Sequence, residues 1–240
     1  MNNNTHTTNH NTDLRRRVVG IVGITAASLA IGATLVGCSE EEGSGDIATL
    51  TMTDVVEPEI TAVTVLDDFD VRVTVDPDAS QSASLTIDDN LINNTDFWID
   101  DGRLFVGWDD AVIGVEPTER PVLTLTVREF ESVENLSDAD VVVTGVDTYD
   151  FDVRSRRDGR VAVDGHATTV DVHATDESAV DLAELTAERV ELVATGNGSL
   201  SVNATEKLTG EITADGDVTV YGGPDTSQVD ASGSGELVMV

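Results

Sequence analysis

The sequence predicts an all-β protein whose main part is a single-stranded parallel β-helix, preceded by further β-strands. Three observations point to this fold class. Apolar side chains recur at one spacing along the C-terminal half, they alternate with polar side chains inside short segments, and Val and Thr dominate those segments. Side chains branched at Cβ fit a pleated sheet better than a helix. Aromatic residues make up only 4% of the chain, so an aliphatic core is expected.

The repeat begins near Asn135 and continues to the C-terminus. Each unit is a strand, a short turn, a second strand, and a turn rich in Gly, Asp and Ser. The first strand supplies an apolar column with spacings of 20, 19, 20, 18 and 19 residues: Val141, Val161, Val180, Leu200, Val218 and Leu237. Two positions on, a companion column runs through Val143, Val163, Leu182, Val202, Val220 and Met239. The second strand supplies two more columns: Phe151, Val170, Val190 and Leu208, and Val153, Val172, Leu192, Gly210 and Val229.

Alternation within each strand means that one side is buried and the other faces water. A unit of about 19 residues cannot bury its apolar side alone, so equivalent strands are expected to stack as successive coils. A sandwich of hairpins is the alternative, but hairpins do not require one fixed spacing over six units.

The turns agree with stacked coils because they fall at one phase of the repeat. Gly and Asn accept positive φ, and Asp and Ser bond their own backbone, as sharp corners require. These turns are Asp138-Ala139-Asp140, Asp158-Gly159, Gly196-Asn197-Gly198-Ser199, Asp215-Gly216-Asp217 and Ser232-Gly233-Ser234-Gly235.

The β-helix domain is expected to span residues 60–240, with shorter strands in its first part. The predicted strands are Ile60–Leu66, Phe69–Val75, Ser82–Ile87, Phe97–Ile99, Arg103–Trp108 and Val122–Val127, with a hairpin turn at Asp100-Asp101-Gly102. The aromatic residues Phe97, Trp98, Phe105 and Trp108 gather here. We expect them to cover an open end of the core; the alternative is an outer strip that stacks on sugar rings.

The N-terminus has the layout of an export signal over residues 1–37. Arg15, Arg16 and Arg17 precede an apolar run from Val18 to Val36, which is typical of a secretory signal. The run is near the length of a membrane span, but Gly, Ser and Thr dilute it.

A single cysteine, Cys38, follows the apolar run at once. Leu35-Val36-Gly37-Cys38 resembles the lipobox of prokaryotic lipoproteins, which implies cleavage before Cys38 and lipidation of its thiol. The sequence therefore predicts a lipid anchor at Cys38, on the extracytoplasmic face of the cell membrane, and an acidic flexible tether over residues 38–59. Whether export follows the general or the twin-arginine route stays open.

The charge balance restricts the partners. The chain carries 46 acidic and 13 basic residues, a net charge of −33, and the part after cleavage would carry 45 against 10, or −35. Such a surface repels nucleic acid, so no nucleic-acid partner is expected. A solvated acidic surface is the favoured interpretation, and capture of cations or of a basic partner is the alternative.

Candidate chemistry in the sequence is weak, and we predict no enzyme, no cofactor and no metal site. Arg154, Arg156, Arg157 and Arg160 form a dense basic group, which we interpret as an offset to Asp150, Asp152 and Asp158 and not as an anion site. His166 and His173 lack an evident third ligand. The Asp-Gly-Asp and Gly-Asn-Gly turns offer oxygens to Ca²⁺ but lack the strict nonapeptide repeat of calcium-binding β-rolls.

One family resemblance rests on two segments. Residues 213–224, Thr-Ala-Asp-Gly-Asp-Val-Thr-Val-Tyr-Gly-Gly-Pro, followed by the Ser-Gly-Ser-Gly turn at 232–235, resemble the auto-transporter adhesin head GIN domain family (DUF2807), and 69–75 is similar to its opening strand. The resemblance implies a right-handed β-helix at a cell surface, without known catalytic residues. The expected function is a non-enzymatic, structural or adhesive envelope module. The alternative is a lipoprotein that binds carbohydrate or cations, with an envelope polysaccharide or protein as partner.

Overall fold

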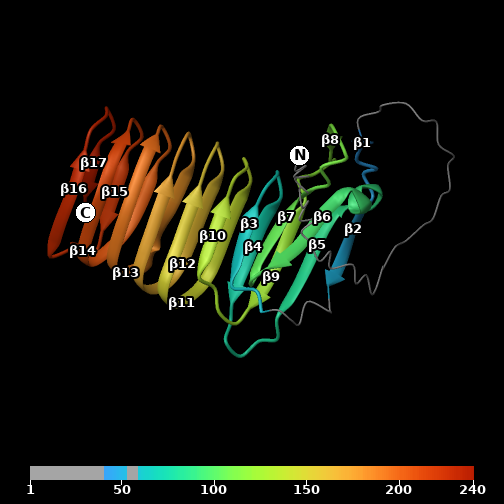
Figure 1. The fold of residues 1–240 in the computed structure, drawn as a ribbon, viewed down its shortest axis with the longest axis horizontal. Coiled ribbons are helices and arrows are strands. Elements are labelled where there is room, and N and C mark those ends of the chain that lie inside the picture. Colours follow the sequence, from blue (N-terminus) through green and yellow to red (C-terminus); the bar gives the residue numbers. More distant parts are fainter. Residues whose placement is uncertain (1–40, 53–58) are drawn as a thin grey trace, which may run out of the picture.

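The computed structural model describes residues 41–52 and 59–240 of the chain. Its strands lie side by side across the long axis, with the antiparallel strands at one end and the last coil at the other (Figure 1). The parallel strands stack as a β-solenoid of about 5 turns, about 20 residues apart, which confirms the predicted fold class. The expected signal peptide and Cys38 lie outside the described residues.

The repeating part consists of parallel strands in the order of the sequence. It comprises β10 (Ser132–Asn135), β11 (Asp140–Ser155), β12 (Arg160–Ala174), β13 (Ala179–Gly196), β14 (Leu200–Ala214), β15 (Val218–Tyr221), β16 (Thr226–Ala231) and β17 (Leu237–Met239). Every pairing among these strands is parallel, as the repeat predicted.

The register confirms the apolar columns. Val141 pairs with Val161, and the same column continues coil by coil to Leu237. Both columns of the second strand are also unbroken register partners. Only the companion column of the first strand is interrupted, between Val163 and Leu182, where the register shifts.

The short turn that we expected inside each unit is a bend within one strand. β11 to β14 are 15 to 18 residues long and contain both predicted strands of their unit. The register shifts at the bend, between Val143 and Val146 on β11. At the same bend Gly165 has a φ of +127° and packs so closely on the Val146 carbonyl that a Cβ would overlap it. A glycine here lets neighbouring coils approach while the chain turns.

In the first part of the domain the order of the strands in the sheet does not follow the sequence. Its strands are β3 (Ala62–Val65), β4 (Asp70–Val75), β5 (Ser82–Asp88), β6 (Thr95–Asp100), β7 (Arg103–Trp108) and β9 (Val122–Val127), with a 3₁₀ helix at Asp89–Asn94. β3 and β4 continue the solenoid, because they pair in parallel with β10 and β11 on one side and with β7 and β9 on the other. The chain thus inserts an early coil between later strands.

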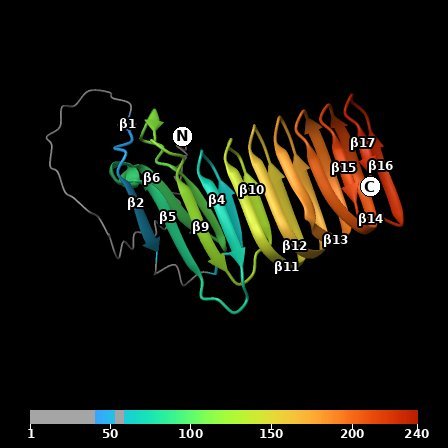
Figure 2. The same cartoon turned by 180° about the vertical axis from the view of Figure 1, so that it is seen from behind.

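Antiparallel strands close this end. β6 and β7 form the predicted hairpin across Asp100 and Arg103, and β5 pairs antiparallel with β9. β2 (Ile47–Met52) then pairs antiparallel with β5 over six residues, and β1 (Glu41–Glu42) pairs with β8 (Val115–Glu116). The expectation of a flexible tether over residues 38–59 is therefore wrong for β1 and β2. Figure 2 shows β2, β5, β9 and β4 side by side from behind.

One continuous core runs through both parts. Leu85, Leu123, Val141, Val153 and Leu192 are fully buried, and all belong to the same cluster of apolar side chains. Within the described residues no helix is both long and apolar enough to cross a membrane.

A candidate interaction face

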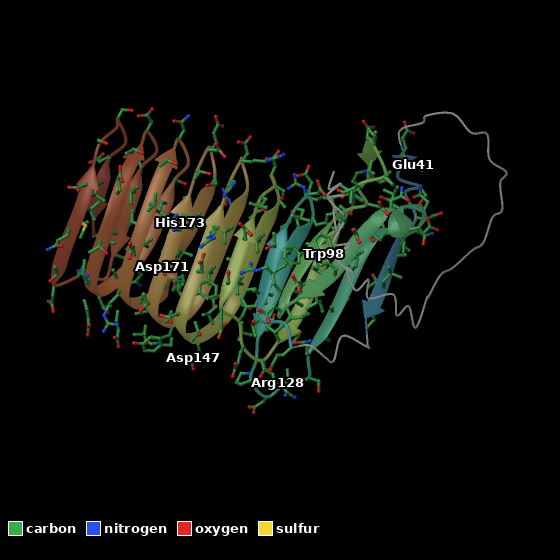
Figure 3. The ribbon with its side chains drawn as sticks, in the orientation of Figure 1. Glu41, Trp98, Arg128, Asp147, Asp171 and His173 are labelled. Carbon is green, nitrogen blue, oxygen red and sulfur yellow. The ribbon has the colours of Figure 1, made fainter. Side chains whose placement is uncertain are left out.

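One side of the solenoid presents an unbroken sheet surface. We call it the aromatic–acidic face and define it as the outward side chains of β6, β7, β3, β10, the second halves of β11 to β14, and β16. These strands are hydrogen-bonded neighbours in this order, so outward residues at equal register form rows along the long axis. Figure 3 shows Trp98 at the antiparallel end of this face and Asp171 and His173 on the coils in its middle.

An aromatic pair marks the antiparallel end of the face. Trp98 and Phe105 are direct partners across the hairpin, and their rings lie 4.7 Å apart with only 3° between their planes. Both are half-buried. A stacked pair of this kind fixes two large side chains against each other and presents a rigid apolar surface.

The other two aromatic residues of the hairpin turn inward. Trp108 packs against the buried ring of Phe69 at 4.6 Å, and Phe97 meets Phe69 edge to face at 6.2 Å. The prediction of an end cover is thus confirmed for Phe97 and Trp108 and wrong for Trp98 and Phe105. Alternation along the strand could have predicted this difference, because the side chains of residues 97 and 98 must point to opposite sides of one strand.

A polar network lies beside the aromatic pair and crosses three strands. The Arg103 guanidinium donates to the Thr64 hydroxyl at 3.2 Å, to the Val63 carbonyl at 3.4 Å and to the Ser132 hydroxyl at 3.0 Å. Thr64 in turn donates to the Glu134 carboxylate at 3.2 Å. Although Thr64 points outward, only 1% of it is exposed. The sequence did not reveal these residues, because their strands are far apart along the chain.

Acidic side chains continue the face over the parallel coils. Asp152, Asp171 and Glu191 are register partners on three successive coils. Neighbouring strands are only about 4.8 Å apart, so these carboxylates repel one another. Burial raises the pKa of the Asp171 carboxyl above its ordinary value, and the charges of Glu191 and Asp152 raise it further, while His173 acts in the opposite direction.

The basic residues lie among these acids. The Arg154 guanidinium binds Asp152 through two hydrogen bonds of 3.2 and 3.0 Å, as the offset interpretation of the arginine group predicted for this pair. Arg156, Arg157 and Arg160 are exposed around the following corner. Arg189 lies 3.6 Å from Glu188 and 4.0 Å from Glu206.

The two histidines do not converge. His166 lies at the bend, where its Nδ1 is 4.0 Å from the Asp147 carboxylate, while His173 lies on the aromatic–acidic face. Among residues 41–52 and 59–240 there is no group of three His, Cys, Asp or Glu side chains arranged to hold a metal ion.

The aspartates of the corner turns are occupied by the backbone of the next coil. Asp215 accepts the Ser234 amide at 2.9 Å and its hydroxyl at 2.7 Å, and these bonds lower the pKa of Asp215. Asp138 accepts the Asp158 amide at 3.3 Å, and Asp217 accepts the Glu236 amide at 3.0 Å. The corner carboxylates therefore join successive coils.

Comparison with solved structures finds the same fold in other bacterial proteins. A putative adhesin from Bacteroides fragilis has a TM-score of 0.68 at 18% identity, with 83% of this chain and 99% of that chain covered. A putative lipid binding protein from Parabacteroides distasonis has a TM-score of 0.50 at 17% identity, with 83% and 98% covered. At this identity the likeness concerns the fold alone. No curated protein matches the chain.

The family model described as "Putative auto-transporter adhesin, head GIN domain" (DUF2807) matches residues 59–224. This match covers more than half of the chain and includes residues 69–75 and 213–224, while the turn at 232–235 lies beyond it. The chain therefore belongs to the auto-transporter adhesin head GIN domain family.

Proposed function

We propose that the chain is a lipid-anchored protein of the cell envelope whose β-solenoid serves adhesion or another binding interaction and does not catalyse a reaction. The observation that carries the proposal is the aromatic–acidic face. Its aromatic pair, its polar network and its acidic rows lie on one continuous sheet, and regular strands hold them in fixed rows. A broad, ordered surface of this kind suits contact with a large partner. Membership of the adhesin head family supports the same role.

The anchor part of the proposal rests on the sequence Leu35-Val36-Gly37-Cys38 after an apolar run. A diacylglycerol on the Cys38 thiol supplies two acyl chains, and stable attachment to a bilayer needs more than one. The domain itself adds no attraction to anionic lipid, because its acidic residues far outnumber its basic ones. Attachment therefore depends on Cys38 alone.

Replacing Cys38 by Ser tests the anchor. Cys38→Ser is expected to move the protein from the membrane fraction to the medium, or to leave the signal uncleaved, as judged by fractionation and by the mass of the intact chain. Ser39→Ala, at the next position, is the matched control and is expected to stay in the membrane fraction. A processed, membrane-bound Cys38→Ser protein would sink the anchor proposal.

A carbohydrate is the second candidate ligand, and the Trp98–Phe105 pair favours it. Aromatic rings offer flat apolar surface to the apolar side of a sugar ring, and the Glu134 carboxylate lies in the polar network beside them. This candidate does not compete with the first, because a surface adhesin can bind an envelope polysaccharide.

Binding of the detergent-solubilised full chain to an array of bacterial polysaccharides tests the aromatic end. Trp98→Ala is expected to lower the signal at least tenfold. Tyr149→Ala is the matched control, because Tyr149 is an aromatic residue with 67% of its surface exposed and lies on β11, three strands from β7 in the sheet and apart from the Trp98–Phe105 pair. Equal binding by Trp98→Ala and the unaltered chain would exclude the aromatic pair as the contact.

A further inference from the structure

Residues 59–240 contain four Asn-X-Ser/Thr sequences, at Asn93, Asn135, Asn197 and Asn203. In an exported protein such a sequence can accept an N-linked glycan, provided that the side-chain amide is accessible and not engaged in the fold. The sequence alone does not separate the four sites. The structure does, because each asparagine has a different environment.

Two of the four asparagines are structural. Asn135 is fully buried, and its Nδ2 donates to the Ala139 carbonyl at 2.7 Å while its Oδ1 accepts the Ser137 amide and hydroxyl. Asn203 is half-buried, and its Nδ2 donates to the Ala183 carbonyl on the neighbouring coil at 3.0 Å. Glycan transfer to either amide would require these bonds to break.

Asn93 meets only one of the two requirements, because its side chain is accessible but the hydroxyl of its motif is bonded. It is exposed in the 3₁₀ helix Asp89–Asn94. The hydroxyl two residues later belongs to Thr95, which is half-buried and donates to the Ile92 carbonyl at 2.8 Å. The hydroxyl that the motif requires is therefore already engaged.

Asn197 lies at the exposed corner between β13 and β14. It has the same position in its coil as Asp138 and Asp215, whose carboxylates accept amides of the next coil. Asn197 departs from that pattern, because within the described chain its side chain makes no hydrogen bond. Ser199, two residues on, is exposed as well.

The backbone beneath Asn197 is nevertheless fixed. Its amide donates to the Asp176 carbonyl at 2.7 Å, and Gly198 packs against the Ser178 carbonyl so closely that a Cβ would overlap it. The corner thus holds the main chain in place and leaves the Asn197 carboxamide and the Ser199 hydroxyl projecting into solvent together.

We propose that Asn197 is the acceptor of an N-linked glycan on the folded, exported chain. The donor is a lipid-linked glycosyl phosphate, used by a transferase of the host envelope. The Nδ2 of Asn197 forms a bond to the anomeric carbon, the anomeric C–O bond to phosphate breaks, the lipid phosphate leaves with the electron pair, and the amide proton passes to solvent. The proposal rests on export to the envelope, which is part of the proposed function.

The test uses the detergent-solubilised full chain, an oligosaccharyl transferase and a lipid-linked oligosaccharide donor. Occupancy of each asparagine is measured by mass spectrometry with electron-transfer fragmentation, since Asn197 and Asn203 share the peptide 190–207. In the folded chain Asn197 is expected to be modified at least tenfold more than Asn135 or Asn203. Unfolding the chain in urea and transferring it into the reaction should reduce that difference.

Two variants separate the motif from the fold. Ser199→Ala removes the hydroxyl of the motif and is expected to abolish modification of Asn197. Ser199→Thr keeps a hydroxyl at this position and is expected to retain the modification. Equal modification of Asn197 and Asn135 in the folded chain would overturn the proposal, as would a bare Asn197 on protein recovered from the outer face of its own cells. Protein that never reaches that face would instead refute export, and the reaction with the purified chain would still decide the site.

Discussion

The two parts of the solenoid share one core but are assembled in different ways. From β10 to β17 the spatial order of strands follows the sequence, and all pairings are parallel. From β2 to β9 the order is interwoven and antiparallel strands are frequent. Each coil of the repeating part contacts mainly its neighbours, so its stability is close to a sum of similar terms. The interwoven part instead depends on single residues that join strands distant in sequence.

The largest expected effect tests that dependence at Phe69. Its ring is fully buried and touches both Phe97 and Trp108 of the closing hairpin. Phe69→Ala is expected to lower the free energy of unfolding by about 3–5 kcal/mol, the usual cost of deleting a buried aromatic ring. Urea unfolding followed by Trp fluorescence measures this. Tyr149→Ala, at an exposed position of β11, should change the free energy of unfolding by less than about 0.5 kcal/mol. A loss below that of a typical surface substitution would contradict the view of Phe69 as a link between strands.

Asp88 offers the next largest effect. It is a fully buried carboxylate at the end of β5, and it accepts the Gly45 amide at 2.8 Å and the Thr118 amide at 2.9 Å. Burial raises the pKa of Asp88, but these amide bonds outweigh it and the net pKa is lowered. Asp88→Ala removes two hydrogen bonds from backbone amides to a charged group and is expected to cost about 1–3 kcal/mol at neutral pH.

The sign of the pH dependence follows from the lowered pKa of Asp88. Its contribution is fully present above the unfolded pKa of about 3.9 and is lost as pH falls through the lower folded pKa. The difference in melting temperature between Asp88→Ala and the unaltered chain should therefore shrink only under strongly acidic conditions. A difference that already vanishes near neutral pH would rule out the carboxylate as the cause.

The third test breaks the regularity of the coils at the bend. Gly165→Ala forces a side chain into positive φ and against the Val146 carbonyl. Overpacking and strain of this kind typically cost about 1–3 kcal/mol. The comparator is Ala162→Gly on the outward side of the same strand, where neither strain nor overlap arises. Thermal unfolding followed by circular dichroism distinguishes the two, and equal melting temperatures would show that coils tolerate a wider bend.

The smallest expected effect concerns Asp171 in the parallel coils. Its contribution to stability depends on pH in the opposite direction to that of Asp88. Burial and the charges of Glu191 and Asp152 raise the pKa of Asp171, so ionisation of this group opposes folding. This destabilising contribution of Asp171 is absent below the pKa of the unfolded state and is complete once pH has risen through the higher pKa of the folded state. Asp171→Asn should thus raise the melting temperature slightly at neutral pH and leave it unchanged at low pH. Asp230→Asn, at the outermost strand of the same face, is the control. A lower melting temperature for Asp171→Asn at neutral pH would contradict the repulsion.

The contrast also explains which parts of the fold could be predicted. The columns through Val141 and Phe151 recur within about 20 residues, so the sequence itself shows which side chains stack. The pairing of β3 with β10 and of β4 with β11 joins residues about 70 positions apart, and no repeat indicates it. Strand β2 was not predicted from the sequence for a related reason. Its Thr-rich segment is a strand because it pairs with β5, which is distant in the sequence.

The candidate face was predictable to a smaller extent. The Arg154–Asp152 pair was predicted because two residues close in sequence supply it. The contacts among Arg103, Thr64 and Glu134 depend on strand order, which the sequence did not show. Asn197 illustrates the opposite case, because its motif is explicit and only the environment of each asparagine distinguishes it.

The position of Trp98 has a mechanical consequence. β6 ends the order of the large sheet, at the opposite end from β17. If the chain is attached through Cys38 and a ligand is held at Trp98, a pulling force enters and leaves through the antiparallel end. The hydrogen bonds between the parallel coils, which run along the long axis, then carry none of that force. A ligand held near β16 would instead load every coil interface in tension, so single-molecule pulling would distinguish the two attachment points by the force at which the solenoid opens.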